Sequence, residues 1–291
     1  MIENKKKISI ISEFIIFLTL ILICIIILNN FAGKSNNINI AVDEEFEENT
    51  INDNEIYVRN IKQKYGIDII FGDDSVDLVS SVDGNVQHNI YVINYNLKNI
   101  IKELEKYPEE VFDIFKSKKY PLKIVLLDYF NNNNLALTSK NSLNEYKIYL
   151  SNTTKYAKAF HHEMYHVLEY YMCDTNKYIY KSWYKLNPEG FNYSSDTELL
   201  NNEYVFMKLT DVSGIDVNIY ETSQNPYFVT IYAKTTERED RAETFSEMMI
   251  AKTKPKYLNE GQNILKKATY IDEAIKKCVT NQEFYYSKYI Y

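Results

Sequence analysis

Glycine and proline are scarce in this sequence, with 7 and 5 residues respectively in a chain of 291. No glycine-rich loop of the kind that binds phosphate groups occurs, so the sequence contains no motif for nucleotide binding. Tyrosine, isoleucine, asparagine and lysine are abundant instead. We interpret this bias as an effect of an AT-rich coding sequence and assign no function to it.

Cysteine is also rare, and the chain contains only Cys24, Cys173 and Cys278. Three cysteines without a Cys-x-x-Cys motif exclude a disulfide-rich scaffold. Cys173 and Cys278 could form a disulfide only if the domain lies outside the cytoplasm. The sequence does not determine whether these two residues are close in space.

An excess of positive charge is missing as well. The net charge is −7 at pH 7, and no stripe of arginine or lysine interrupts this acidic balance. Bulk binding of nucleic acid is therefore excluded, and we expect no nucleic-acid partner.

One long hydrophobic run is present, at residues 8–28, directly after three lysines at 5–7. About 20 apolar residues span a bilayer as a helix, and flanking lysines favour the cytoplasmic side. Glu13 interrupts the run near its cytoplasmic end, where a charge is tolerated. These features predict a single-pass protein of the cell membrane with an extracytoplasmic C-terminal domain. The alternative is a cleaved signal peptide and secretion, although residues 30–32 form a poor cleavage site.

Three parts of the chain follow from this pattern. We predict a cytoplasmic tip and transmembrane anchor at 1–28, a flexible acidic tether at 29–56, and a folded domain at 57–291. In the domain, residues 67–71 and 122–127 are typical of strands, whereas the apolar spacing over 97–104 is typical of an amphipathic helix. The pattern becomes mostly helical after residue 175. The sequence therefore predicts an α+β domain with a mixed N-terminal lobe and a mostly helical C-terminal lobe.

The chain has four histidines, and three of them lie in residues 160–171. At 100° per residue, His162 and His166 share one side of a helix, and an apolar face lies opposite. Two imidazoles one turn apart can bind one ion, and their neutral nitrogens suit zinc. Glu163 lies beside them and can take a proton from a water that attacks a carbonyl. The adjacent His161 is more typical of a surface or supporting residue than of a metal ligand.

A catalytic zinc site needs a third protein ligand and an open position. Residues 236–249 (TEREDRAETFSEMM) offer Glu239 and Glu243, one helical turn apart. Thr236 and Glu239 also fit a capping box, in which the glutamate would bond its own helix terminus. Residue spacing alone therefore leaves Glu239 and Glu243 as alternative ligands.

These residues resemble a known family, the lethal-factor-like zinc peptidases of the gluzincin class, which include the Pro-Pro endopeptidases. The matching stretches are His162-Glu163-x-x-His166, Phe228-Val229-x-x-Tyr232-Ala233 and Glu239-Asp240-x-Ala242-Glu243-x-Phe245. The resemblance covers roughly residues 57–255. The longer gap between His166 and Glu239 departs from the family pattern. It implies an insertion, which we expect near residues 183–193, where it would affect substrate specificity.

The resemblance implies a two-lobed zincin-like fold and a zinc endopeptidase that acts on protein or peptide. It implies that Glu239 is the third zinc ligand, that Tyr232 stabilises the oxyanion, and that Glu243 orients a ligand. Residues 144–150 (NEYKIYL) would form an edge strand that either pairs with substrate or is simply shielded by Lys147. We expect a monomer. The alternatives are an inactive module with structural zinc and an anchored interaction protein with a chance motif.

Overall fold

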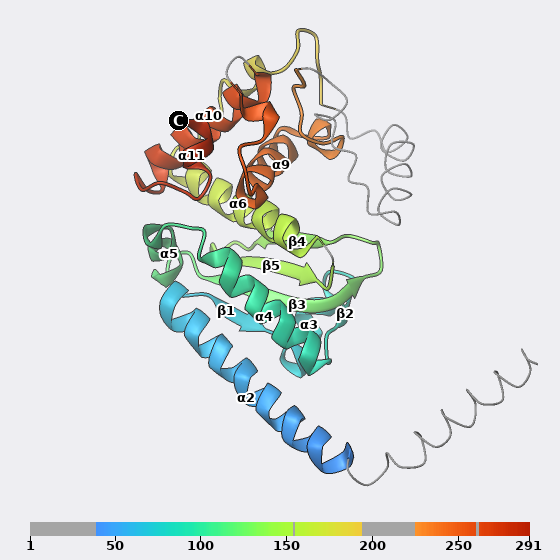
Figure 1. Cartoon of the computed structure of the whole chain (residues 1–291). Coiled ribbons are helices and arrows are strands. Elements are labelled where there is room, and N and C mark those ends of the chain that lie inside the picture. The colour runs from blue at the N-terminus through green and yellow to red at the C-terminus, as the bar shows by residue number, and fades with distance from the viewer. Residues whose placement is uncertain (1–38, 154, 194–224, 260–261) are drawn as a thin grey trace, which may run out of the picture. The chain divides into compact units, whose positions relative to one another are not determined.

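The computed structural model describes residues 39–153, 155–193, 225–259 and 262–291 (Figure 1). The α-helices are α2 (Asn39–Tyr65), α3 (Val76–Ser80), α4 (Ile90–Leu104), α5 (Glu109–Lys116), α6 (Tyr156–Thr175), α9 (Glu237–Ile250), α10 (Asn263–Cys278) and α11 (Ser287–Ile290). The strands are β1 (Asp68–Ile70), β2 (Gly84–Val86), β3 (Leu122–Phe130), β4 (Ala136–Lys140) and β5 (Tyr146–Ser151). Short 3-10 helices are η1 (Gly72–Ser75), η2 (Trp183–Leu186), η3 (Tyr232–Lys234) and η4 (Lys256–Leu258). The chain divides into two compact units, and the unit from Asn54 to Tyr291 contains the sheet and the helices α3 to α11.

The five strands form one mixed sheet in the order β1-β3-β5-β4, with β2 on β3. β3 pairs in parallel with both β1 and β5, and β2 pairs antiparallel with the C-terminal part of β3. Along β3, Ile124 and Leu126 belong to the main core, whereas Val125 and Leu127 belong to a smaller core with Val79 of α3. β3 is therefore buried on both faces, which explains its nearly continuous apolar sequence.

The strand at the edge of the sheet is not the one that the sequence predicts. The strand predicted at 144–150 is confirmed as β5, but its edge position is wrong because β4 pairs antiparallel along its outer side. The sequence of β4, ALTSK, has too little apolar character to indicate a strand. A tight turn joins β4 to β5 and holds the two strands side by side. In this turn the Asn141 side chain accepts hydrogen bonds from the backbone N–H groups of Leu143 and Glu145. Among the described residues no strand pairs with the other side of β4, so β4 forms the edge of the sheet beyond β5.

Helix α2 occupies much of the segment that was expected to be a flexible tether. Residues 39–56 are helical rather than irregular, and residues 29–38 lie outside the described part of the chain. Acidic residues dominate the first half of α2, whereas Lys62 and Lys64 lie in its last turn, an order that the helix dipole favours. Ile61 and Tyr65 of its last turns are buried in the main core. The division into anchor, tether and domain stays a prediction.

The expectation of a single-pass membrane protein is not supported and requires correction. Within the described ranges, no helix combines the length and the apolar character needed to cross a membrane. The longest of them, α2, has 27 residues but carries acidic side chains along its first half. Residues 8–28, on which the expectation depended, lie outside the described residues.

Helix α6 lies between the sheet and the C-terminal helices (Figure 1). It contacts β4, β5 and α4 on one side and α9 and α10 on the other. One continuous core joins both parts and includes Phe160, Met164 and Leu168 of α6 and Phe245 of α9. The predicted α+β class is confirmed, and the helix with the paired histidines lies at its centre.

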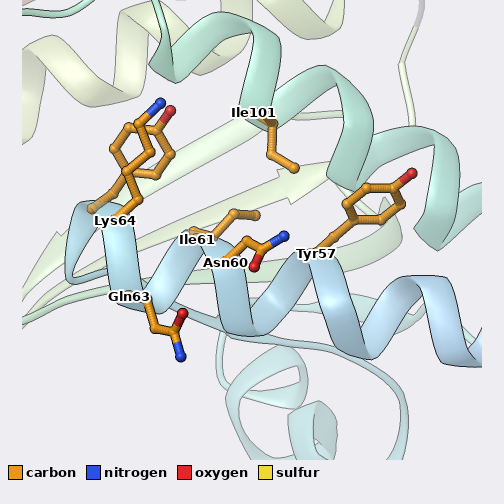
Figure 2. Close-up of a pocket in the computed structure, with 7 residues that line it drawn as sticks. Tyr57, Asn60, Ile61, Gln63, Lys64 and Ile101 are labelled. Carbon is orange, nitrogen blue, oxygen red and sulfur yellow. The ribbon is translucent and has the colours of Figure 1, made fainter.

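A surface groove of about 560 Å³ lies between α2 and α4 (Figure 2). It is lined by Tyr57, Asn60, Ile61, Gln63, Lys64, Tyr65 and Ile101. None of these residues belongs to α6 or α9, so the groove is separate from the histidine pair.

Gly66 ends α2 in a conformation that other residues rarely adopt. Its φ angle is +72°, and its N–H donates to the carbonyl of Lys62 at 3.0 Å. A Cβ at this position would lie 2.8 Å from the backbone nitrogen of Lys116, so the backbone would have to move. Gly66 therefore allows the close approach of α2 and the end of α5.

We predict that Gly66→Ala lowers the free energy of unfolding by roughly 2–4 kcal/mol, from backbone strain together with the clash. Gly72→Ala is the matched control, because Gly72 has φ +59° but a Cβ added there would meet nothing within 4 Å. The control should lose only about 1 kcal/mol. Urea unfolding of both variants measures the difference, and equal losses would contradict the packing argument.

Candidate metal centre

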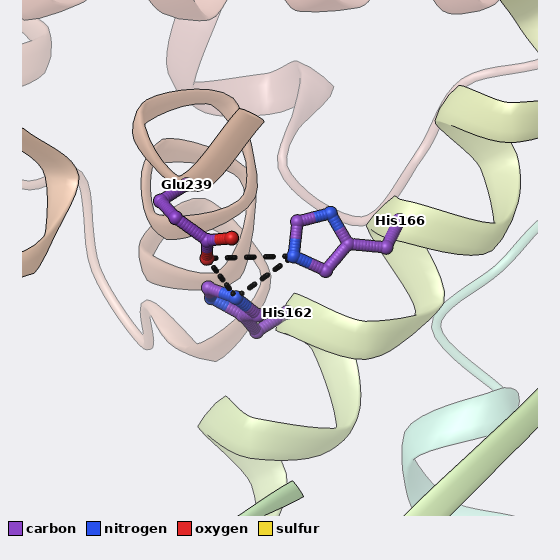
Figure 3. A group of neighbouring side chains, drawn as sticks. All are labelled: His162, His166 and Glu239. Atoms are coloured by element: carbon purple, nitrogen blue, oxygen red, sulfur yellow. Dashed lines mark hydrogen bonds and ion pairs between the residues drawn. The ribbon is translucent and has the colours of Figure 1, made fainter. Parts of the chain in front are cut away.

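Three side chains from α6 and α9 converge on one point (Figure 3). Nε2 of His162 lies 2.9 Å from Oε2 of Glu239 and 3.1 Å from Nε2 of His166. The remaining distance, from Nε2 of His166 to Oε2 of Glu239, is 3.5 Å. Two neighbouring turns of α6 supply the histidines, and the first turn of α9 supplies the carboxylate.

The spacing of these donor atoms fits a zinc ion. Donors at about 2.1 Å from one tetrahedral zinc lie roughly 3.4 Å from one another, close to the spacing of this group. Two imidazole nitrogens and one carboxylate oxygen are also a donor set that zinc uses in catalytic sites. The three residues can therefore hold zinc with little rearrangement and leave a fourth position free.

The structure separates Glu239 from Glu243, which residue spacing could not do. Thr236 caps α9, and its hydroxyl accepts the N–H of Glu239 at 3.2 Å. Only this half of the capping box is present, because the Glu239 carboxylate turns to the two histidines. Glu243 lies on the other side of His162, where its Oε1 accepts a hydrogen bond from Nδ1 at 2.8 Å.

Glu243 is itself held by other groups. Its second oxygen accepts from the hydroxyl of Thr230 at 2.8 Å and lies 3.2 Å from Nζ of Lys158. Burial opposes the charge on Glu243, but Lys158 and His162 outweigh it and hold the pKa of the carboxyl well below its usual range. Glu243 therefore stays ionised and fixes the orientation of the His162 ring.

The two carboxylates also change the protonation of His162. Burial lowers its pKa, but hydrogen bonds with Glu239 and Glu243 outweigh this effect and raise the pKa to about 10. A zinc ligand must be the neutral imidazole, so metal binding at Nε2 has to displace a proton from this ring.

Glu163 and Tyr232 lie next to the three donors. Glu163 is buried, and its backbone carbonyl accepts from the hydroxyl of Thr138 on β4 at 3.1 Å. The Tyr232 ring lies 5.9 Å from the His162 ring, and 37% of the residue is exposed. Burial and the nearby carboxylates of Glu239 and Glu163 raise the pKa of Tyr232, so its phenol keeps the proton that it needs to donate.

His161 is fully buried, so of the two expected roles, surface residue or supporting residue, the structure excludes the first. Its Nδ1 lies 2.7 Å from the hydroxyl of Tyr107, and its Nε2 lies 2.7 Å from Oε2 of Glu103. Burial lowers the pKa of His161 to about 4, so the ring is neutral at pH 7. It connects α6 to α4 and is not part of the metal-binding group.

No sequence pattern indicated a role for Glu169, Arg238 or Arg241. The Glu169 carboxylate is buried and accepts from Nε of Arg238 at 2.8 Å and from Nε of Arg241 at 2.5 Å. Burial raises the pKa of Glu169, but His166 and the two arginines outweigh this effect and lower the pKa to about 2. The available signal was positional, since Glu169 follows His166 by three residues and the arginines flank Glu239.

Residues 183–193, where we expected an insertion, pack against the start of α9. Trp183 is fully buried, and its indole N–H donates to Oδ2 of Asp240 at 3.2 Å. The same oxygen accepts from Tyr193 at 2.6 Å and from Nζ of Lys267 on α10 at 2.6 Å. Asp240 directly follows Glu239, so this buried network anchors the turn that carries the third donor.

We predict that Lys267→Met lowers the free energy of unfolding by roughly 3–5 kcal/mol, because it leaves the Asp240 charge buried without a counterion. Lys266→Met is the matched control, since Lys266 is exposed on the same helix and contacts Asn263 only at 3.5 Å. Chemical unfolding of the metal-free protein measures both. Similar stabilities for the two variants would show that the buried pair contributes little.

No protein-family model matches the chain, and no curated protein does. A solved structure from Bacteroides caccae, described as a "putative zinc-binding metallo-peptidase", matches with a TM-score of 0.47 and 17% identity. The match covers 79% of this chain and 87% of that chain. A likeness this distant does not establish a family, so membership of the lethal-factor-like class stays a prediction, and functional conclusions depend on the side chains described above.

Proposed function

We propose that this chain is a zinc-dependent endopeptidase that hydrolyses protein or peptide substrates. The observation that carries the proposal is the convergence of His162, His166 and Glu239 on one point, with Glu163 adjacent in α6. The partly exposed Tyr232 next to the same point supports it. Metal ligands, a general base and a hydrogen-bond donor for an oxyanion are the groups that peptide hydrolysis requires.

The chain's own residues would divide the chemistry among them. His162, His166 and Glu239 would hold zinc, which supplies a Lewis acid that polarises the substrate carbonyl and makes water a better nucleophile. Glu163 would take the proton from the attacking water and pass it to the leaving amine. Tyr232 would donate to the oxyanion of the tetrahedral intermediate, a contact worth about 3 kcal/mol.

The open edge of β4 is the best candidate for binding an extended substrate. Leu135 and Asn141 make backbone hydrogen bonds to the β5 side, to Ser151 and Glu145. Because backbone groups alternate in direction along an antiparallel strand, residues 136, 138 and 140 present theirs to the open edge. The Thr138 hydroxyl also donates to the backbone carbonyl of Glu163, so β4 contacts α6 at the residue proposed as general base. An extended peptide could add to the sheet here, which is one of the two alternatives given above for residues 144–150.

We predict that Glu163→Gln retains stoichiometric zinc but lowers peptide cleavage by roughly 10²–10⁴-fold, because an amide cannot accept the proton. Metal content of the purified variant and turnover of a peptide library measure the two effects. Cleavage at the wild-type rate would exclude this mechanism. Zinc binding by the wild-type protein without cleavage of any peptide would instead favour the alternative of a structural zinc module.

We predict that Glu239→Ala loses most of its zinc affinity, whereas Glu243→Ala loses only about 10- to 100-fold. The first change removes a donor atom, and the second removes the hydrogen bond that orients His162. Competition with a chromophoric chelator measures both dissociation constants. The reverse order of effects would assign the ligand role to Glu243.

A further inference from the structure

The two candidate histidine ligands differ in whether Nδ1, the ring nitrogen that would not bind the metal, has a hydrogen-bond partner. Nδ1 of His162 is hydrogen-bonded to Glu243 at 2.8 Å. Nδ1 of His166 is buried and has no hydrogen-bond partner among the residues that the structure describes. Oε2 of Glu169 lies 3.9 Å from this nitrogen, just beyond hydrogen-bonding distance. A hydrogen bond between Glu169 and His166 would therefore give each histidine a carboxylate partner at Nδ1.

The Glu169 carboxylate is held firmly from the opposite helix. Its Oε1 accepts from Arg241 at 2.5 Å, and its Oε2 accepts from Arg238 at 2.8 Å. Arg241 is almost fully buried, and the guanidinium of Arg238 stacks on the Tyr170 ring at 4.3 Å. Both oxygens of Glu169 are thus fixed before any contact with His166 forms.

The placement of these groups connects the two halves of the metal centre. Glu169 follows His166 by three residues in α6, and the arginines flank Glu239 in α9. The same ion pairs that hold Glu169 therefore also set the position of the helix that supplies the third donor.

We infer that Glu169 is a positioning residue for His166, an inference that rests on the proposed metal-binding function. With a metal at Nε2, the His166 ring carries its proton on Nδ1. This N–H donates a hydrogen bond to Oε2 of Glu169 once the two atoms lie roughly 1 Å closer together. This hydrogen bond fixes the ring orientation and the tautomer that leaves Nε2 free to bind. The arginines neutralise Glu169 and keep it from competing as a ligand.

An ordinary ion pair between two helices is the competing explanation. It would account for the contacts between Glu169 and the arginines, but it requires no effect of Glu169 on the metal. The two explanations therefore differ in metal affinity and in the ligand field at the ion, not in the stability of the metal-free protein.

The test is Glu169→Gln in the full chain, with Glu237→Gln as the matched control. Glu237 lies 3.5 Å from Arg241. Its substitution therefore removes a carboxylate from the same arginine and leaves the carboxylate behind His166 in place. Competition with a chromophoric chelator gives the zinc dissociation constants. We expect Glu169→Gln to bind zinc about 10- to 100-fold more weakly and Glu237→Gln to bind it like the wild type.

A second measurement separates positioning from stability. With cobalt(II) in place of zinc, the visible absorption bands report the ligand field, and thermal unfolding in chelator reports the metal-free protein. We expect Glu169→Gln to change the cobalt spectrum and Glu237→Gln to leave it unchanged. If Glu169→Gln does not fold, Glu169→Asp replaces it, because aspartate keeps a negative charge for the arginines while its shorter side chain withdraws the carboxylate from His166.

The outcomes distinguish this inference from the proposed function. Wild-type zinc affinity together with a wild-type cobalt spectrum in Glu169→Gln, or in Glu169→Asp where that variant decides, would overturn the positioning role. Failure of the wild-type protein to bind zinc at equimolar concentration would instead overturn the proposed function.

Discussion

The contact between α6 and α9 is the interaction on which the rest of this structure depends. It joins apolar packing, such as the Tyr165 and Phe245 rings at 4.9 Å, to a group of buried charges. Each buried ion loses several kcal/mol of hydration, so isolated carboxylates here would strongly favour unfolding. Pairing offsets this cost, because Glu243, Glu169 and Asp240 each contact at least one cation. The helices can approach this closely only in an arrangement that satisfies all of these pairs.

This constraint also separates the chemistry of the two acidic residues one turn apart on α9. Glu243 is enclosed by Lys158 and Thr230, so its charge is already neutralised and its oxygens are occupied. Among the described residues, Glu239 pairs with the two histidines and with no lysine or arginine, and it faces the side where Tyr232 reaches solvent. The surroundings of each carboxylate, rather than its residue type, make Glu239 a candidate metal ligand and Glu243 a residue that orients His162.

Much of the fold followed from local patterns. The apolar spacing near Leu97 and Ile100 correctly indicated α4, and the apolar run that begins at Leu122 correctly indicated β3. β4 could not be recognised, because its polar sequence gains strand character only from pairing with β5. Residues 39–56 contain few core residues, so their composition indicated disorder, whereas their charge order is compatible with the helix that forms.

The sequence by itself determined that His162, Glu163 and His166 lie on adjacent turns of one helix, because helical period is a local property. Tertiary structure alone decided that Glu239 faces both histidines, that the arginines of α9 hold Glu169 behind His166, and that β4 rather than β5 is the edge strand. These relations join residues that are far apart in the chain or that depend on a neighbouring element. Their distances are set by how the helices and strands pack, and the period of a single helix carries no information about that packing.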